Sequence, residues 1–143
     1  MKKIITLICA VIITAACGAN KAQDGNAGHD GYTVLKDGVY GGREQAGTVT
    51  ITDATAFNSL CAELSIEEIP AVDFAKKNVV AVFMGQKSTG GYSIMIEKMD
   101  VKDNTVYLKK KEIAPDADGM ATMALSAPYV LVSVPKTDKV VVE

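Results

Sequence analysis

Few side chains in this sequence could carry out chemistry, and those few are poorly placed to act together. The only histidine is His29, and the cysteines are Cys9, Cys17 and Cys61. A Cys–His nucleophile pair would need Cys61 beside His29, but Cys61 falls on the apolar stripe of a predicted helix, where a buried core thiol is expected. A single histidine also argues against histidine-based acid–base catalysis and the usual zinc sites. We therefore expect no cofactor, no metal site and no catalytic residue.

A carboxylate pair is the remaining catalytic alternative, with Asp73 acting beside Glu97 or Asp116. Asp73 stands next to Phe74 in a connector that Pro70 keeps extended, since the residue before a proline avoids the helical region. There we expect the Asp73 carboxylate to cap or pin the backbone. The sequence thus favours a protein that is not an enzyme, with carboxylate chemistry left as an alternative.

The most informative segment is 85–94, in which Gly90 and Gly91 separate two strand-like runs. Glycines permit a tight turn and the close approach of a partner's backbone. Thr89 and Tyr92 add hydrogen-bonding groups and an aromatic anchor, so one interpretation is protein recognition. The other is a hairpin that needs a positive φ at one glycine, with Tyr92 covering the core. The segment lacks the full spacing of a phosphate-binding P-loop, and a strand follows it where a helix should begin.

The elements that must position this segment are mostly strands. Runs rich in β-branched and apolar residues predict strands over 32–35, 48–51, 79–84, 92–101, 105–113, 129–134 and 139–142. The run 79–84 does not alternate, which predicts a central strand covered on both faces. A turn is expected at 102–104.

One helix is predicted over 53–64, capped by Thr52 or Asp53. Its apolar positions follow the i, i+3, i+4, i+7 rule and should lie on a sheet: Phe57, Leu60, Cys61 and Leu64. The order of elements predicts an α+β fold, an antiparallel sheet or meander of six or seven strands with this helix packed on it. A β-sandwich with one inserted helix is the alternative.

Strand parity predicts that two loops share one end of the domain. In a meander, alternate connections fall at the same end, and 85–91 and 114–128 are alternate connections separated by the turn 102–104. Their aromatic, thioether and small side chains would form a patch suited to a protein partner. The predicted partner-binding residues are Ser88, Thr89, Gly90, Gly91, Tyr92, Met120, Met123, Pro128 and Tyr129.

The N-terminal segment has the composition of an export signal, with Lys2 and Lys3 before an apolar run over 4–16. That run is too short for a spanning helix, which needs about 20 apolar residues. Small residues leading into Cys17 resemble a bacterial lipoprotein signal, which implies cleavage before Cys17, diacylation of its thiol and attachment to the cell envelope. An ordinary cleaved secretory signal is the alternative. The expected organisation is a signal peptide over 1–16, a lipidated cysteine and flexible tether over 17–31, and one globular domain over 32–143.

The charge pattern argues against a nucleic-acid partner. The formal net charge is −2, and no basic stripe is interleaved with aromatic residues. The basic run Lys109, Lys110 and Lys111 falls in a predicted strand, where alternate side chains point to opposite faces and cannot form one patch.

The C-terminal half resembles the PrcB family, a family of bacterial lipoproteins. The matching segments are Pro70-Ala71-Val72-Asp73-Phe74, Val79-Val80-Ala81-Val82-Phe83-Met84-Gly85, Ser88-Thr89-Gly90-Gly91-Tyr92-Ser93-Ile94, Ser126-Ala127-Pro128 and Val132-Ser133-Val134-Pro135-Lys136. Their order and spacing are similar to those of the family's C-terminal domain, and the similarity covers 68–143. It implies a non-enzymatic subunit that binds or stabilises a surface protease or another secreted protein, and it transfers no catalytic residue.

A second resemblance leaves an alternative function open. The segment from Ser88 to Tyr92 is similar in kind to the Thr-Gly-aromatic loop of chagasin-like cysteine-peptidase inhibitors. The chain lacks the Asn-Pro lead-in and the Arg-Pro turn of those inhibitors. Peptidase inhibition through Ser88 to Tyr92 is therefore the alternative to an accessory, partner-binding function.

Overall fold

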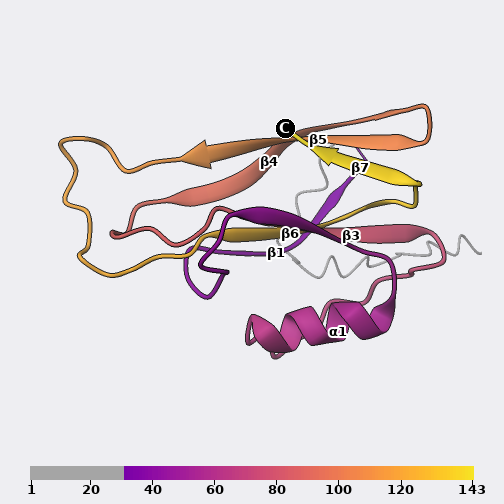
Figure 1. Ribbon diagram of the computed structural model, residues 1–143, viewed down its shortest axis with the longest axis horizontal. Helices are drawn as coiled ribbons and strands as arrows, with labels where there is room; N and C mark the ends of the chain where they lie inside the picture. The colour runs from indigo at the N-terminus through magenta and orange to yellow at the C-terminus, as the bar shows by residue number, and fades with distance from the viewer. Residues whose placement is uncertain (1–30) are drawn as a thin grey trace, which may run out of the picture.

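The computed structural model describes residues 31–143, which form seven strands and one helix (Figure 1). The elements are β1 (Thr33–Gly38), β2 (Gly47–Ile51), α1 (Ala54–Glu63), β3 (Lys77–Phe83), β4 (Ser93–Lys102), β5 (Thr105–Ile113), β6 (Tyr129–Pro135) and β7 (Lys139–Val142). Each lies within a few residues of its predicted position. The predicted signal peptide and Cys17 lie outside the described residues. Over 31–143, no helix has the length and apolar character needed to cross a membrane.

The α+β fold class is confirmed, but the strands are divided between two sheets. One sheet has the order β1-β6-β3-β2, with every neighbouring pair antiparallel, and the other has the order β4-β5-β7. In the second sheet β4 and β5 form an antiparallel hairpin, while β5 and β7 are parallel. The two facing sheets are the arrangement that the sandwich alternative describes.

The burial patterns explain why β3 and β4 are not neighbours in one meander. Residues 78–83 of β3 and 129–134 of β6 are buried without alternation, so these strands pair with each other at the centre of the larger sheet. Strand β4 alternates buried and exposed residues along its first half. It has only one face to bury, and it therefore lies in an outer sheet.

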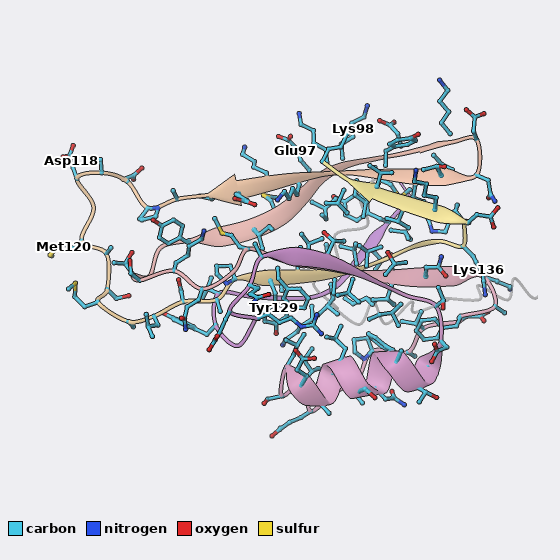
Figure 2. All side chains as sticks on the ribbon, viewed as in Figure 1. Glu97, Lys98, Asp118, Met120, Tyr129 and Lys136 are labelled. Carbon is cyan, nitrogen blue, oxygen red and sulfur yellow. The ribbon has the colours of Figure 1, made fainter. Side chains whose placement is uncertain are left out.

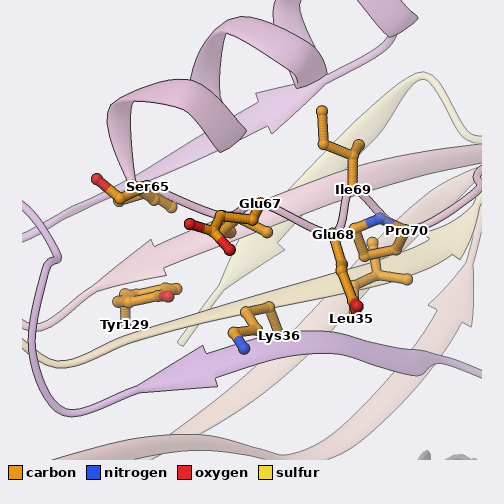
Figure 3. A pocket seen from close by; sticks show the side chains of 10 residues that line it. Leu35, Lys36, Ser65, Glu67, Glu68, Ile69, Pro70 and Tyr129 are labelled. Carbon is orange, nitrogen blue, oxygen red and sulfur yellow. The ribbon is translucent and has the colours of Figure 1, made fainter.

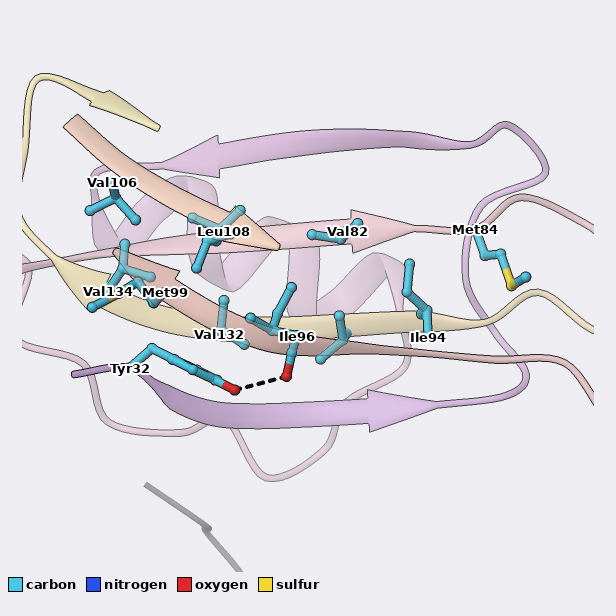
Figure 4. Packing of buried hydrophobic residues seen from close by; sticks show 12 residues of the cluster. Tyr32, Val82, Met84, Ile94, Ile96, Met99, Val106, Leu108, Val132 and Val134 are labelled. Carbon is cyan, nitrogen blue, oxygen red and sulfur yellow. Dashed lines mark hydrogen bonds between the residues drawn. The ribbon is translucent and has the colours of Figure 1, made fainter. Parts of the chain in front are cut away.

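The domain has three layers, with the four-stranded sheet between α1 and the three-stranded sheet (Figure 1). Alternate residues of β3 enter different cores, so Val80 and Val82 belong to the core shared with the smaller sheet. Figure 4 shows Val82 in this core. Val79 and Phe83 face the helix. The prediction that 79–84 is covered on both faces is confirmed.

Helix α1 begins and packs as its sequence predicts. The cap is Asp53, whose carboxylate accepts a hydrogen bond from the backbone N–H of Ala56 at 2.8 Å. Phe57, Leu60 and Cys61 are buried against the four-stranded sheet. The Cys61 thiol is fully buried, and the desolvation raises its pKa. A thiol that stays protonated in the core is a poor nucleophile.

Two local features fix the smaller sheet. Asp103 and Asn104 have φ of 49° and 55°, so the predicted turn is a tight hairpin with both central residues in the left-handed region. The strand pairing shifts between Ile96 and Lys98, and the buried Tyr32 hydroxyl donates a hydrogen bond to the Ile96 carbonyl at 2.8 Å (Figure 4). Tyr32 thereby joins the chain just before β1 to β4, across the interface of the two sheets.

Candidate functional site

Three loops meet at one end of the domain, opposite the turn between β6 and β7 (Figure 1). They are residues 39–46, 84–92 and 114–128, called here the three-loop end. Lys87 and Ser126 form an antiparallel bridge, with N···O distances of 2.7 and 3.0 Å. The predicted meeting of 85–91 with 114–128 therefore occurs, although β3 and β4 belong to different sheets.

The long loop 114–128 packs on the turn that contains Gly90 and Gly91, called here the glycine turn. The N–H of Gly90 donates to the Thr122 carbonyl at 2.9 Å, and a Cβ on Gly90 would collide with the Thr122 hydroxyl. Gly91 has a φ of +87°, and a Cβ there would lie 2.6 Å from the Cβ of Pro115. The Ser126 hydroxyl donates to the Thr89 carbonyl at 2.6 Å. The glycines are therefore required for the loop to pack, in addition to the positive φ that the sequence predicts.

The predicted partner-binding residues separate into exposed and covered groups. Met120 and Met123 are fully exposed, at 103% and 92%, and Met120 stands at the outer edge of the loop (Figure 2). Ser88 and Gly91 are also exposed, whereas Thr89 is half-buried and Gly90 is buried. The exposed surface thus belongs mainly to the long loop.

Tyr92 has a structural contact as well as a half-exposed ring. It packs against the core between the two sheets, and the Lys87 ammonium lies 5.6 Å from the ring centroid. The ring therefore covers the core, as one of the two interpretations of the turn predicts. Its remaining exposure leaves it able to contribute one edge to a contact surface.

Pro128 and Tyr129 are not surface residues, and including them in the patch was wrong. Pro128 is fully buried and its carbonyl accepts a hydrogen bond from the Met84 N–H at 3.0 Å. Tyr129 is 5% exposed as the first residue of β6, and its ring centroid lies 6.5 Å from that of Phe83. Burial is the main cause that raises the Tyr129 pKa, and the charge of Asp37 adds to it. Tyr129 is a core residue because β6 is a central strand, and Pro128 is buried directly before it.

The first loop supplies exposed apolar side chains that sequence reasoning missed. Val39 is 41% exposed and Tyr40 is 54% exposed, and Leu125 in the long loop is 60% exposed. The Ala127 N–H donates to the Val39 carbonyl at 3.0 Å, which joins the first loop to the long one. An apolar pair between glycines, as in Gly38-Val39-Tyr40-Gly41, is a usable signal, but placing it here requires the β1–β6 pairing.

Arg43 fixes the first loop to the body of the domain. Its guanidinium donates two hydrogen bonds to the Glu63 carboxylate, at 2.7 and 2.9 Å. The same group lies 4.8 Å over the ring of Phe83. These hydrogen bonds lower the pKa of Glu63 and raise that of Arg43. The loop is therefore held by a bidentate ion pair and a cation–π contact.

Comparison with known protein families identifies the part of the chain that forms this end. Residues 78–135 match the family model described as PrcB C-terminal. This part of the chain is similar to the PrcB C-terminal domain. The resemblance predicted from the sequence motifs is confirmed over these residues, which include two of the three loops. Comparisons with curated proteins and with solved structures found no significant match.

The carboxylates considered for catalysis belong to three different parts of the fold. Asp73 accepts a hydrogen bond from the Ala75 N–H at 3.0 Å, so it pins the connector as expected. Glu97 lies on the outer sheet, where its carboxylate is 3.2 Å from the Lys109 ammonium (Figure 2). Asp116 belongs to the long loop. Within 31–143, no three His, Cys, Asp or Glu residues are grouped as a metal site.

An open groove of about 650 Å³ lies between β1 and the connector after α1 (Figure 3). Its charged side chains are Lys36, Glu67 and Glu68, with Ile69 and Tyr129 among the others. The ten side chains that line it include neither histidine nor cysteine. Of the predicted site residues, only the largely buried Tyr129 borders this groove.

Proposed function

We propose that this chain is a non-catalytic, lipid-anchored protein of the bacterial cell envelope that binds a protein of a protease complex through the three-loop end. The family match supports the association with a protease complex. We choose this surface because Met120, Met123 and Leu125 are exposed on a loop that hydrogen bonds attach to the domain.

The three-loop end presents apolar side chains on a loop that hydrogen bonds hold against the domain. Binding residues are commonly carried by loops on a rigid scaffold, and apolar side chains gathered on a surface mark interaction sites. Methionine is suited to such a surface because its unbranched, polarizable side chain adapts to the shape of a partner. Val39 and Tyr40 belong to the adjoining loop and extend the same end.

The covered glycine turn argues against peptidase inhibition. A chagasin-like inhibitor would present the segment from Ser88 to Tyr92 to the peptidase. Here the Gly90 N–H is already bound to the Thr122 carbonyl, and Thr89 accepts from Ser126. We expect no inhibition when the domain is assayed in micromolar excess against a panel of cysteine and serine peptidases. Stoichiometric inhibition of one of them would restore this alternative.

Site-specific crosslinking in cells tests the proposed surface. A photoreactive amino acid at Met120 of the full chain should yield an adduct with a subunit of a protease complex. The matched control carries the same amino acid at Lys136, which is exposed at the opposite end of the domain (Figure 2). Equal adducts from both positions, or none from Met120, would contradict the assignment of the surface.

The proposed anchor rests on the sequence around Cys17 and has its own test. Two or more lipid chains hold a protein stably on a membrane, where a single chain gives marginal binding. Cys17→Ser should move the protein from the membrane fraction to the soluble fraction and remove incorporation of labelled fatty acid. Retention of Cys17→Ser in the membrane fraction would count against lipid anchoring.

A further inference from the structure

The methionines of residues 31–143 fall into sharply different environments. Met84 and Met99 are buried between the two sheets, at 6% and 9% exposure. Met95 is half-exposed at 44% on β4, whereas Met120 and Met123 are exposed at 103% and 92%. Two thioethers in one loop are thus open to solvent on all sides, and the same chain contains buried thioethers for comparison.

The loop backbone holds these two side chains away from the domain. Between them, the Thr122 carbonyl is bound by the Gly90 N–H at 2.9 Å, and the Ala121 N–H donates to the Gly119 carbonyl at 3.0 Å. Thr122 therefore attaches this part of the loop to the glycine turn, and the methionines on either side of it belong to neither core. Figure 2 shows Met120 at the tip of the loop, pointing outward.

We propose that Met120 and Met123 form an oxidative modification site that controls docking at the three-loop end. The oxidant is a peroxide. The thioether sulfur attacks one oxygen of hydrogen peroxide, and the O–O bond breaks. The departing hydroxide takes the proton from the oxygen that is now bonded to sulfur and leaves as water. The sulfur is oxidised to the sulfoxide by two electrons and the peroxide is reduced. Methionine sulfoxide reductases reverse the change, one enzyme for each sulfoxide epimer.

The consequence for docking rests on the proposed function. A sulfoxide converts a flexible apolar side chain into a polar one, so oxidation removes the apolar surface that Met120 and Met123 supply. Neither residue packs in a core, so the fold is unaffected. Oxidation therefore acts on binding and leaves stability unchanged.

Peptide mass spectrometry of the full-length protein after dilute hydrogen peroxide tests the site itself. Met120 and Met123 should gain one oxygen at least about tenfold faster than Met84 and Met99, with Met95 between them. The thermal unfolding midpoint should not change once only the two loop methionines are oxidised. Equal rates for the exposed and buried methionines, or a lowered midpoint at that stage, would overturn the site.

Crosslinking from Leu125 tests the effect on docking, since this position leaves both methionines in place. Oxidised protein should give an adduct yield lowered about fivefold or more, and reductase treatment should restore it. The matched control Met120→Leu with Met123→Leu keeps the volume, cannot form a sulfoxide, and should be insensitive to peroxide. If the two loop methionines are oxidised selectively and the adduct yield does not change, the proposed effect of oxidation on docking is wrong, while the modification site stands. If the reduced protein gives no adduct, the proposed function and the proposed effect of oxidation on docking are both wrong. The oxidation rates of the methionines still test the modification site itself.

Discussion

Replacing Gly91 with alanine tests whether the long loop 114–128 packs on the glycine turn. Gly91 has a φ of +87°, in the left-handed region that costs an L-residue about 1–2 kcal/mol. Its new Cβ would also lie 2.6 Å from the Cβ of Pro115, which belongs to a rigid ring. Overpacking of this kind costs about 1–3 kcal/mol when the neighbour cannot move. We therefore expect Gly91→Ala to lower the free energy of unfolding by about 2–5 kcal/mol.

Gly47→Ala is the matched control. Gly47 is exposed at the start of β2, has no positive φ, and a Cβ there would meet no atom within 4 Å. Alanine at such a position is neutral or stabilising by a few tenths of a kcal/mol, because it restricts the unfolded chain. In urea unfolding, the free energies of unfolding of the two variants should therefore differ by at least about 2 kcal/mol, with Gly91→Ala the less stable. Equal midpoints would refute the strain and the contact together.

A double-mutant cycle with Pro115→Gly separates the contact from the backbone strain. Removing the Pro115 ring relieves the clash but leaves the positive φ of residue 91, so the double variant should recover about 1 kcal/mol or more relative to the sum of the single changes. Faster hydrogen exchange of the Gly90 amide in Gly91→Ala would report release of its bond to Thr122. If the changes in the free energy of unfolding are strictly additive and the hydrogen exchange of the Gly90 amide does not change, the long loop does not pack on this turn.

Three further changes probe the supports of the site. Hydrogen bonds from Arg43 lower the pKa of Glu63, so the ion pair stabilises the fold fully above the ordinary carboxyl pKa of 4.5 and loses this effect as the pH falls through the lowered value. Glu63→Gln should therefore lower the free energy of unfolding by at most about 1 kcal/mol in urea at neutral pH. A difference between variant and wild type that persists at about pH 2 would contradict this. The Cys61 thiol should be alkylated at least about 100-fold more slowly in the native protein than in urea, as followed by peptide mass spectrometry, and equal rates would disprove its burial. Tyr32→Phe should lower the free energy of unfolding by about 1–2 kcal/mol because it removes the buried hydrogen bond to the Ile96 carbonyl, and an unchanged urea midpoint would rule that out.

Local sequence patterns determined the elements and their buried faces. The spacing of Phe57, Leu60 and Cys61 predicts the helix and the stripe that it buries, because side chains three and four residues apart share one helix face. The unbroken apolar run 79–84 predicts a strand covered on both sides. The turn at 102–104 is predicted from its residue types. In each case, the physical cause acts between residues that are near in sequence.

The composition of the site depended on contacts between distant segments. Pairing of β1 with β6 brings Val39 and Tyr40 to the three-loop end, and the central position of β6 buries Tyr129. The sequence around Tyr129 does not distinguish a loop-end aromatic from a core one, because burial depends on which strands become neighbours. The order of strands within each sheet, and the division into two sheets, depend on the same non-local pairing.

The glycine pair shows how the two levels combine. The sequence by itself predicts a turn at Gly90 and Gly91, with a positive φ at one of them, and the family of the segment 78–135. Only the tertiary structure places Thr122 and Pro115 against these glycines and leaves Met120 and Met123 exposed. A backbone torsion is set locally by sterics, whereas exposure is set by which parts of the folded chain cover one another.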